Sequence, residues 1–322
     1  MQEFDLIDKR ILYELDLDSR ISASQLARKI RKSKETVNFR ITRLLKMGYL
    51  KGFYSVLNTS KMGWYYYKFY LKFKNSTPAK EQEILKYLSR QKHIAYLASV
   101  EGNYDCLALV MIRGPEEMLS VVDAFMREYG AYIQEKEIVT VLSAHRFNQR
   151  FLYPGEEAKD STYPVKLGAY PLDEIDKRIL NIVNANARMP LTEIAEKAGA
   201  DAKVVKYRLR KLERDGIILG YVTSLNFDKI GTQFTQLNIS LTDPTKRHAI
   251  IEFFSGTKKC LFAVELLGKY DLTIELHVDD NKQLKGILNA FREAFAGSYT
   301  DYDVSAIDKE HVMVWSPFLE KN

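Results

Sequence analysis

The chain has 322 residues, of which 46% are hydrophobic and 28% are charged. That length accommodates two to four compact domains, and a composition near the globular average excludes long disordered tails. The first residues lack a secretory signal, and no stretch approaches the ~18 consecutive apolar residues of a membrane span. We therefore expect a soluble, cytoplasmic protein without a membrane partner.

The sequence contains one long internal repeat. Residues 7–12 (IDKRIL) return as residues 175–180, an offset of 168, and the register continues without a gap for more than 50 residues. Farther on, Gly102 aligns with Gly268 at an offset of 166, which places a two-residue length change near residues 74–78. A length change of this kind belongs in a surface loop, so the repeat predicts two copies of one architecture.

The first part of each copy is predicted to contain three short helices, because apolar residues recur there at helical spacing. Ser33 and Asp201 are suited to cap the third helix at its beginning, and Gly48 and Gly216 are suited to end it.

A wing is predicted to follow the third helix of each copy. Residues 49–57 and 217–225 are rich in aromatic and β-branched residues around a glycine, which favours a short two-stranded wing in each copy. Three short helices and a wing form a winged helix-turn-helix.

The second part of each copy alternates strands and helices. In the first copy, strands are predicted at 66–73, 93–100, 104–112 and 133–142, and helices at 80–90 and 115–129. The second copy follows the same order from residue 233 to residue 307. The order β-α-β-β-α-β predicts a ferredoxin-like domain, with two helices on one face of an antiparallel sheet.

The fold class is therefore α+β, with two repeats of a winged helix-turn-helix followed by a ferredoxin-like βαββαβ domain. The predicted winged domains span 1–63 and 172–231, the predicted ferredoxin-like domains, for which the family resemblance given below implies effector sensing and dimerisation, span 64–152 and 232–322, and a linker rich in proline and glycine spans 153–171.

Positive charge is concentrated in the two winged modules. When Lys and Arg are counted against Asp and Glu, residues 1–63 carry +6, residues 169–231 carry +2, and the remainder of the chain carries −2. Double-stranded DNA is the partner that such basic modules favour, because phosphate contacts release counterions. An alternative is that the weakly charged second module serves dimerisation or scaffolding.

The third helix of each winged module supplies the candidate DNA contacts, because its predicted buried face leaves a polar and aromatic face outside. In the first copy the candidates are Lys32, Lys34, Glu35, Thr36, Asn38, Phe39, Arg40, Thr42, Arg43 and Lys46. In the second copy they are Lys203, Lys206, Tyr207, Arg208, Arg210, Lys211 and Arg214. Since Arg or Lys favours guanine and Asn favours adenine, the two helices are predicted to prefer different half-sites.

Several of these residues have a structural alternative. Arg40 and Arg208 lie near the helix flank, so phosphate contact and a structural ion pair are both open. Phe39 and Tyr207 could equally pack against a neighbouring domain. Arg43 and Lys46 are predicted to face outward, where they would contact a base or a phosphate.

A Gly-x-Tyr-Asp turn occurs in the second part of each copy, at residues 102–105 and 268–271. Gly102 and Gly268 supply the positive φ of a tight connection between strands, and the aspartate is expected to hold the turn through its own backbone. A structural role alone is sufficient to explain both turns.

Taken together, these motifs resemble those of the Lrp/AsnC family, the feast/famine regulators of prokaryotes. The resemblance is carried by Asp8 with Ile11-Leu12, by the stretch from Ser33 to Leu44, by residues 48–52 (GYLKG) and by the Gly-x-Tyr-Asp turn, each echoed in the second copy. It implies a sequence-specific DNA-binding transcription regulator modulated by a small, amino acid-like molecule.

The resemblance also implies where an effector would bind. In the family this turn lies at the contact between two effector domains, so the implied effector-binding residues are Gly102, Asn103, Tyr104, Asp105, Gly268, Lys269, Tyr270 and Asp271. Family members carry one unit and dimerise through these domains. This chain carries two units, so pairing within the chain and homo-oligomer formation are both expected.

Signatures of enzymes, metal sites and cofactor sites are absent from the sequence. It has no phosphate-binding glycine loop, no nucleophile elbow and no Cys/His set with metal spacing, so we expect no enzyme, no metal and no cofactor. The alternative is a sirohaem decarboxylase-like enzyme, a class that reuses this fold in paired copies. Residues 95–112 lack the histidine that such a site needs, so regulation is favoured. A sensing subunit that does not touch DNA is a further alternative.

Overall fold

The structure is a computed structural model that describes residues 4–153, 160–164 and 168–318. The chain divides into two compact units, and each unit combines equivalent parts of both repeats. Unit 1 contains both three-helix regions, and unit 2 contains both ferredoxin-like regions. The predicted domain boundaries follow the covalent order of the repeats, whereas the units cut across that order because equivalent parts pair with each other.

Unit 1 contains three helices from each copy, as predicted. They are α1 (Leu6–Leu17), α2 (Ala23–Ile30) and α3 (Lys34–Lys46) in the first copy and α6 (Glu174–Ala185), α7 (Leu191–Ala198) and α8 (Ala202–Arg214) in the second. The Ser33 hydroxyl caps α3 by accepting the N–H of Thr36 at 3.1 Å, whereas Asp201 makes no side-chain cap bond to α8. Gly48 follows the end of α3 with φ of 72°, as its predicted stop role requires.

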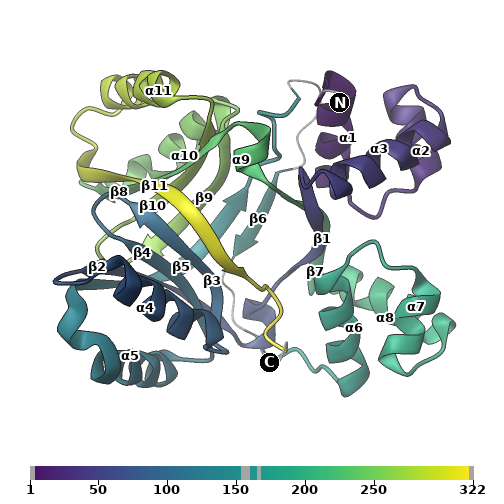
Figure 1. Cartoon of the computed structure of the whole chain (residues 1–322), viewed down its shortest axis with the longest axis horizontal. Helices are drawn as coiled ribbons and strands as arrows, with labels where there is room; N and C mark the ends of the chain where they lie inside the picture. Colours follow the sequence, from purple (N-terminus) through teal and green to yellow (C-terminus); the bar gives the residue numbers. More distant parts are fainter. Residues whose placement is uncertain (1–3, 154–159, 165–167, 319–322) are drawn as a thin grey trace. The chain divides into compact units, whose positions relative to one another are not determined.

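The predicted two-stranded wing within each module is wrong. Each copy supplies a single strand, β1 (Leu50–Leu57) or β7 (Ile218–Leu225), and the two strands pair antiparallel with each other. One strand per copy leaves its backbone N–H and C=O groups without partners, and the equivalent strand of the other copy satisfies them. Figure 1 shows the helices of the first copy above those of the second, with β1 and β7 beside both.

Polar side chains join the two copies further within unit 1. The Asn184 amide donates to the carbonyl of Ser55 at 2.9 Å, and the Thr223 hydroxyl donates to Asp16 at 3.1 Å. The Arg188 guanidinium donates to the carbonyl of Ser19 at 2.5 Å. These bonds are largely buried, so they hold the two three-helix modules of one chain together as a pair.

Unit 2 contains the two ferredoxin-like regions, and each has the predicted βαββαβ order. The first is formed by β2 (Tyr65–Phe73), α4 (Pro78–Arg90), β3 (Ile94–Glu101), β4 (Cys106–Ile112), α5 (Pro115–Tyr129) and β5 (Ile133–Arg146). The second is formed by β8 (Gln233–Leu241), α10 (Arg247–Gly256), β9 (Cys260–Leu267), β10 (Leu272–Val278), α11 (Asn281–Ala294) and β11 (Tyr299–Met313). A short helix, α9 (Phe227–Ile230), precedes β8.

The strands of both regions close into one ring. The pairings run in the order β2-β4-β3-β11-β8-β10-β9-β5, and β5 pairs again with β2. The copies meet where β3 pairs with β11 and where β5 pairs with β9, both antiparallel. The two ferredoxin-like regions therefore pair with each other within one chain. A ninth strand, β6 (Ser161–Pro164), adds to the edge of the sheet from within the predicted linker; residues 154–159 and 165–167 of that linker lie outside the described residues.

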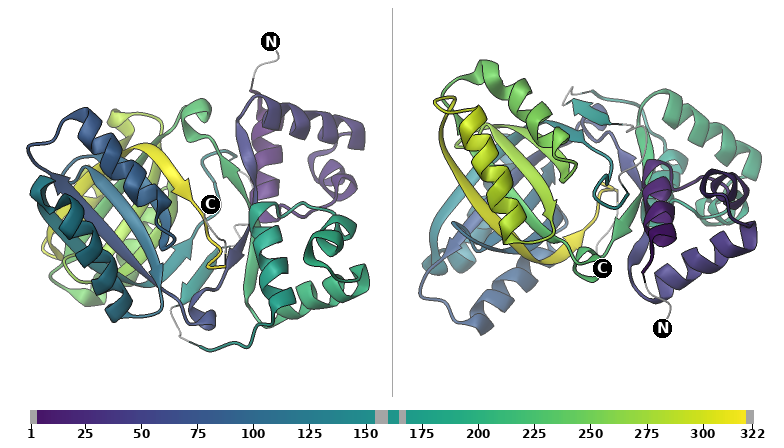
Figure 2. Two further views of the ribbon diagram at one scale, coloured as in Figure 1. Left: turned by 60° about the horizontal axis from the view of Figure 1, so that its bottom comes forward. Right: turned by 90° about the horizontal axis from the view of Figure 1, so that it is seen from above.

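The ring has two kinds of face. Its outer face packs against the helices, with α4 and α5 on one side and α10 and α11 on the other (Figures 1 and 2). In the first copy, alternate strand residues such as Phe69, Leu71 and Ala108 join the helices in one apolar core. Residues between them, such as Tyr70 and Leu107, point into the ring, where they pack with Leu266 and Tyr270 of the other copy.

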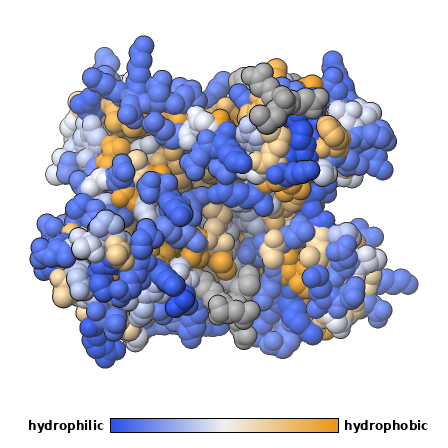
Figure 3. Space-filling model, in the orientation of Figure 1, coloured by the Kyte–Doolittle hydropathy of each residue, from blue (hydrophilic) through white to orange (hydrophobic). Residues whose placement is uncertain are grey.

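The face drawn in Figure 3 is largely hydrophilic. Large exposed apolar side chains are scattered among the described residues, at positions such as Leu6, Leu119 and Leu267. No helix among the described residues has both the length and the apolar character that crossing a membrane requires.

Candidate functional site

Helices α3 and α8 present the exposed face that a recognition helix needs. Their buried residues are those predicted, namely Val37, Ile41 and Leu44 in α3 and Val205, Leu209 and Leu212 in α8. The exposed candidates are Lys32, Lys34, Glu35, Asn38, Phe39, Thr42, Lys46, Lys203, Lys206, Tyr207, Arg210 and Arg214. Phe39 and Tyr207 are 60% and 64% exposed, so neither is packed away within its unit. Thr36, Arg40, Arg43, Arg208 and Lys211 are half-buried.

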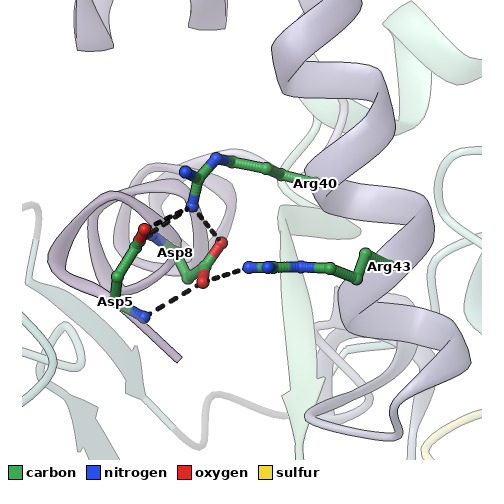
Figure 4. A network of polar contacts seen from close by, with 4 residues as sticks. All are labelled: Asp5, Asp8, Arg40 and Arg43. Carbon is green, nitrogen blue, oxygen red and sulfur yellow. Dashed lines mark hydrogen bonds and ion pairs between the residues drawn. The ribbon is translucent and has the colours of Figure 1, made fainter. Parts of the chain in front are cut away.

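Two arginines of α3 are anchored to the beginning of α1 (Figure 4). Arg40 donates to Asp8 at 2.9 Å and to Asp5 at 2.8 Å, and Arg43 donates to the second carboxylate oxygen of Asp8. Asp8 is fully buried, and the two arginine side chains are only 14% and 13% exposed. A buried carboxylate requires such partners, so this network, which we call the anchor, fixes α3 against α1.

Asp5 completes the anchor and caps α1. Its carboxylate accepts the N–H of Asp8 at 2.9 Å, and the Asp8 carboxylate accepts the N–H of Asp5 at 3.1 Å, which forms a capping box. Partial burial opposes ionisation of Asp5, but the Asp8 N–H and the Arg40 guanidinium outweigh burial and lower the pKa of Asp5. Asp5 therefore remains charged at neutral pH.

The second copy repeats part of this anchor. Arg208 donates to Asp173 at 2.5 Å and to Asp176 at 3.0 Å, and these three residues correspond to Arg40, Asp5 and Asp8. The ion-pair alternative left open for the two arginines is thus the arrangement that the structure contains. The residue corresponding to Arg43 is Lys211, so the two anchors are not identical.

The predicted outward orientation of Arg43 is not what the structure shows. A helical wheel considers only the buried apolar stripe, and it overlooked a carboxylate on α1 within reach of the arginine side chain. The signal was present in the sequence, because Asp8 and Asp176 occupy the same place in the repeated IDKRIL motif while Arg40 and Arg208 recur at the same offset.

The glycines of the Gly-x-Tyr-Asp turns have the predicted positive φ, at 149° for Gly102 and 144° for Gly268. A Cβ at Gly102 would lie 2.7 Å from the carbonyl of Val304, and one at Gly268 would lie 2.8 Å from the Val139 side chain. Each turn thus lies directly against a strand of the other copy. This places both turns at the contact between the two ferredoxin-like regions.

The aspartates hold the turns through their own backbone, as predicted, because the carbonyl of Asp105 accepts the N–H of Val100 at 3.0 Å and that of Asp271 accepts the N–H of Leu266 at 2.9 Å. Their carboxylates make a further contact that was not predicted. Asp105 accepts the N–H of Phe73 at 2.7 Å, and Asp271 accepts the N–H of Leu241 at 2.8 Å. Each carboxylate therefore also ties the turn to the end of a neighbouring strand, β2 or β8. The neighbouring strand ends there, and its last N–H needs an acceptor.

Tyrosines from the two turns meet inside the ring. The hydroxyls of Tyr104 and Tyr270 are 3.4 Å apart, and Lys269 Nζ lies 2.8 Å from the Tyr104 hydroxyl and 3.1 Å from Glu135. Partial burial opposes the charge on Lys269, but these two partners outweigh it and raise the pKa of Lys269. Asn103, the counterpart of Lys269, is exposed.

The inner face of the second copy contains polar residues that the sequence reasoning missed. Thr273, Glu275 and His277 alternate along β10 and are directed away from the helix-facing core, and β8 adds Gln236 and Asn238 on the same face. Burial lowers the pKa of His277 to about 3, with a smaller contribution from Lys259. Residues 95–112 of the first copy contain no histidine, whereas the equivalent strands of the second copy contain His277.

No group of three or more His, Cys, Asp or Glu side chains that could hold a metal ion occurs among the described residues. Cys106 and Cys260 are both buried and not bonded to each other. Burial raises the pKa of the Cys106 thiol, which makes it unreactive.

The sequence is similar to known regulators. The family model for winged helix-turn-helix DNA-binding domains matches residues 4–51 and 172–218. The HTH-type transcriptional regulator LrpA of Pyrococcus abyssi is 38% identical over 121 residues, which are 37% of this chain and 84% of that protein. An uncharacterised HTH-type transcriptional regulator of Pyrococcus furiosus is 34% identical over 122 residues, which are 37% of this chain and 82% of that protein.

A solved structure is similar over nearly the whole chain. The crystal structure of the siroheme decarboxylase NirDL superimposes with a TM-score of 0.65, covering 96% of this chain and 93% of that chain at 14% sequence identity. At this identity the likeness shows a shared fold and not a shared activity.

Proposed function

This chain belongs to the Lrp/AsnC family of HTH-type transcriptional regulators, and we propose that it reads an asymmetric site on double-stranded DNA with the two unlike recognition helices of a single chain. Such a regulator acts on the chromosome, so we expect it in the cytoplasm. The observation that carries the proposal is that α3 and α8 share the contacts of Arg40 and Arg208 with equivalent aspartates and yet expose different residues.

The exposed residues differ where base contacts are expected. Asn38 of α3 corresponds to Lys206 of α8, and Thr42 corresponds to Arg210. In the major groove, asparagine pairs with adenine, whereas lysine and arginine pair with guanine. The aromatic position is retained as Phe39 and Tyr207, both suited to contact with thymine methyl groups or sugars. We therefore expect half-sites that differ in their preferred bases.

We assign different roles to the exposed and the half-buried basic residues of the two recognition helices. Lys46, Arg210 and Arg214 are exposed and available for phosphate or base contacts. Arg40, Arg43 and Arg208 are engaged with carboxylates of the first helix of their module, so we assign them to holding the recognition helices in place.

The test is binding of the full chain to duplex DNA at two salt concentrations. The proposal predicts affinity that falls steeply with salt, and a loss of affinity for Lys46→Ala and Arg214→Ala. Lys86→Ala is the matched control, because Lys86 is an exposed lysine on α4 of the other unit. Salt-insensitive binding, or equal effects of all three substitutions, would contradict the proposal.

We further propose that a small, amino acid-like effector binds at the paired Gly-x-Tyr-Asp turns. Lys269 and Glu135 are about half-exposed there, and they are 3.1 Å apart. A cation and a carboxylate at this separation match the two charged groups of a zwitterion, which would replace their mutual ion pair. Asp105 and Asp271 bind strand ends, so we assign them a structural role in the site.

A thermal shift measured with each of the twenty amino acids tests the effector proposal. We expect a shift for a subset of them in the wild-type protein, and a loss of that shift in Lys269→Asn, which installs the residue of the first copy. An unchanged thermal shift in the variant would mean that the effector binds at another site.

The alternative function is a sirohaem decarboxylase-like enzyme. It is considered because the NirDL fold is similar over nearly the whole chain. Regulation is favoured because the relatives with the higher sequence identity are transcriptional regulators, and because the recognition helices keep exposed basic and aromatic residues that a decarboxylase does not need. Sirohaem binding without salt-sensitive DNA binding would reverse this preference.

A further inference from the structure

Inside the ring of unit 2, equivalent positions of the two copies touch and are occupied by different residues. Tyr70 of β2 corresponds to Asn238 of β8 at the offset of 168. The Tyr70 hydroxyl donates to the Asn238 side-chain oxygen at 3.2 Å, and both side chains are fully buried. A contact between equivalent positions is where pairing of two identical copies would bring a residue against itself.

The second copy supplies two further partners for the Asn238 amide. Its oxygen also accepts the Thr273 hydroxyl at 2.7 Å, and its nitrogen donates to Asp303 at 3.1 Å. The residue of the first copy that corresponds to Thr273 is Leu107, which cannot donate. The polar network is thus built on one copy and receives a single tyrosine from the other.

A charge pair joins the copies a short distance along the same strands. Lys68 Nζ of β2 lies 3.9 Å from the Glu275 carboxylate of β10, and the Lys68 side chain is only 5% exposed. Lys68 Nζ has no hydrogen-bond partner among the described residues, and Gln236 donates to Glu275 at 3.2 Å. Gln236 and Leu109 are the counterparts of Lys68 and Glu275, so the related contact carries no charge.

From these contacts we propose that the inner faces of the two ferredoxin-like regions are complementary to each other and not to themselves, so that a first copy pairs only with a second copy, in the same chain or in another. Lys68 with Glu275 supplies the charge complementarity. Tyr70 with Asn238 supplies the complementarity of size and hydrogen bonding.

Pairing of like copies would lose both kinds of complementarity. Two first copies would set Lys68 opposite Leu109 and bring two Tyr70 rings into the space that one tyrosine and one asparagine fill. Two second copies would leave Glu275 without a cation and two short asparagines at the centre. Buried charges without partners and mismatched volumes are strongly unfavourable, so both like pairings are less stable than the pairing of a first copy with a second copy.

The pair acts through selectivity more than through stability. Burial lowers the pKa of Lys68 to about 8, although Glu275 counters part of this effect. Burial likewise raises the pKa of Glu275, although Lys68 opposes the shift. Desolvation thus exceeds the attraction between the two charges, as is common for buried ion pairs that are retained for specificity.

Charge reversal in the full chain tests the proposal. Lys68→Glu sets two carboxylates together, and Glu275→Lys sets two ammonium groups together, so each variant should unfold at a lower urea concentration than the wild type. The double variant Lys68→Glu with Glu275→Lys should recover at least half of the lost urea midpoint. A double variant whose loss equals the sum of the two single losses would overturn the proposal.

Co-expression of the two single variants with different tags gives a readout that structural damage alone would not produce. Exchange of whole repeats between the chains lets the carboxylate introduced at position 68 of one chain meet the ammonium group introduced at position 275 of the other, while the wild-type Lys68 and Glu275 also meet. We expect a mixed 1:1 complex in native mass spectrometry at several times the level found for two tagged wild-type chains. A level no higher than that wild-type control would contradict the proposal even if the single variants prove unstable.

Discussion

The two recognition helices differ most where they face outward and least where they meet the rest of their module. Arg40 and Arg208 bind aspartates at the beginning of the first helix of each copy, at the same repeat offset. At the exposed positions the two copies carry different kinds of side chain, such as the neutral Asn38 and the positively charged Lys206. The inner faces of the ring show the same division, because Leu109 corresponds to Glu275 while the helix-facing core of each copy stays apolar.

This comparison separates two demands on a duplicated chain. Residues that build each module are kept in both copies, since each copy must fold in the same way. Several residues that face a partner, such as Asn38 against Lys206 and Leu109 against Glu275, have diverged, and the partner is either the DNA or the other copy. Substitutions at the shared anchor and at the positions where the copies differ test this division.

The largest effect is expected at the shared anchor. Asp8→Asn removes the carboxylate that two arginines bind in a buried site, so we expect a loss of about 3–5 kcal/mol in the free energy of unfolding. Asp176→Asn should lose less, because Arg208 is its one ion-pair partner among the described residues and is more exposed. Urea unfolding of the full chain measures both values, and equal losses would show that Arg43 adds nothing to the first anchor.

The next effect concerns the exposed face of α8. The double substitution Lys206→Asn and Arg210→Thr gives α8 the residues of α3 at two positions where base contacts are expected. Each lost base contact should weaken binding to the preferred site by about 1–3 kcal/mol. Binding to a site with two copies of the first half-site should improve, as measured by competition between labelled duplexes. A uniform loss on both duplexes would assign these residues to phosphate contact.

The buried His277 predicts a difference in acid sensitivity between the copies. Its folded pKa is about 3, below the unfolded value, so the folded state holds it neutral. The free energy of unfolding therefore decreases as the pH falls from about 6.5 towards 3. At pH 5 it is about 2 kcal/mol lower than at a pH above 6.5. His277→Met, which installs the residue found at position 111, should remove this loss in urea unfolding at pH 5. His248→Met at the exposed His248 is the control, and an equal change in both variants would contradict the prediction.

The smallest expected effect distinguishes the helix caps. Ser33→Ala removes a hydroxyl that accepts the N–H of Thr36, so we expect a loss of about 1 kcal/mol in the free energy of unfolding. Asp201→Ala should lose less, because Asp201 makes no side-chain cap bond. Thermal unfolding of the two variants measures the difference. A larger loss for Asp201→Ala would mean that its charge near the helix N-terminus outweighs a hydrogen bond.

Much of the fold was predictable because local patterns determine it. The helix predicted at 115–129 matches α5 (Pro115–Tyr129), and the six-element order of each ferredoxin-like region was found from alternation and turn residues alone. The pairing of β1 with β7 was not predicted, because strand partners depend on contacts between residues more than 160 positions apart. No local pattern distinguishes a strand that pairs within its module from one that pairs with the other copy.

The candidate sites were predictable in part. The exposed face of α3 followed from helical periodicity, and the turn glycines followed from their spacing. The anchoring of Arg43 was missed because the partner carboxylate lies on another helix, and a wheel for one helix cannot include it. The polar inner face around Glu275 was missed because in a half-buried strand an alternating polar residue indicates solvent exposure as readily as a buried network.

Selection of randomised duplex DNA by the full chain, followed by sequencing of the bound fraction, tests whether the two recognition helices read different bases. We expect one asymmetric motif whose two halves prefer different bases, with only one half changed by Lys206→Asn and Arg210→Thr. A palindromic motif, or a motif in which the double substitution changes both halves alike, would contradict it.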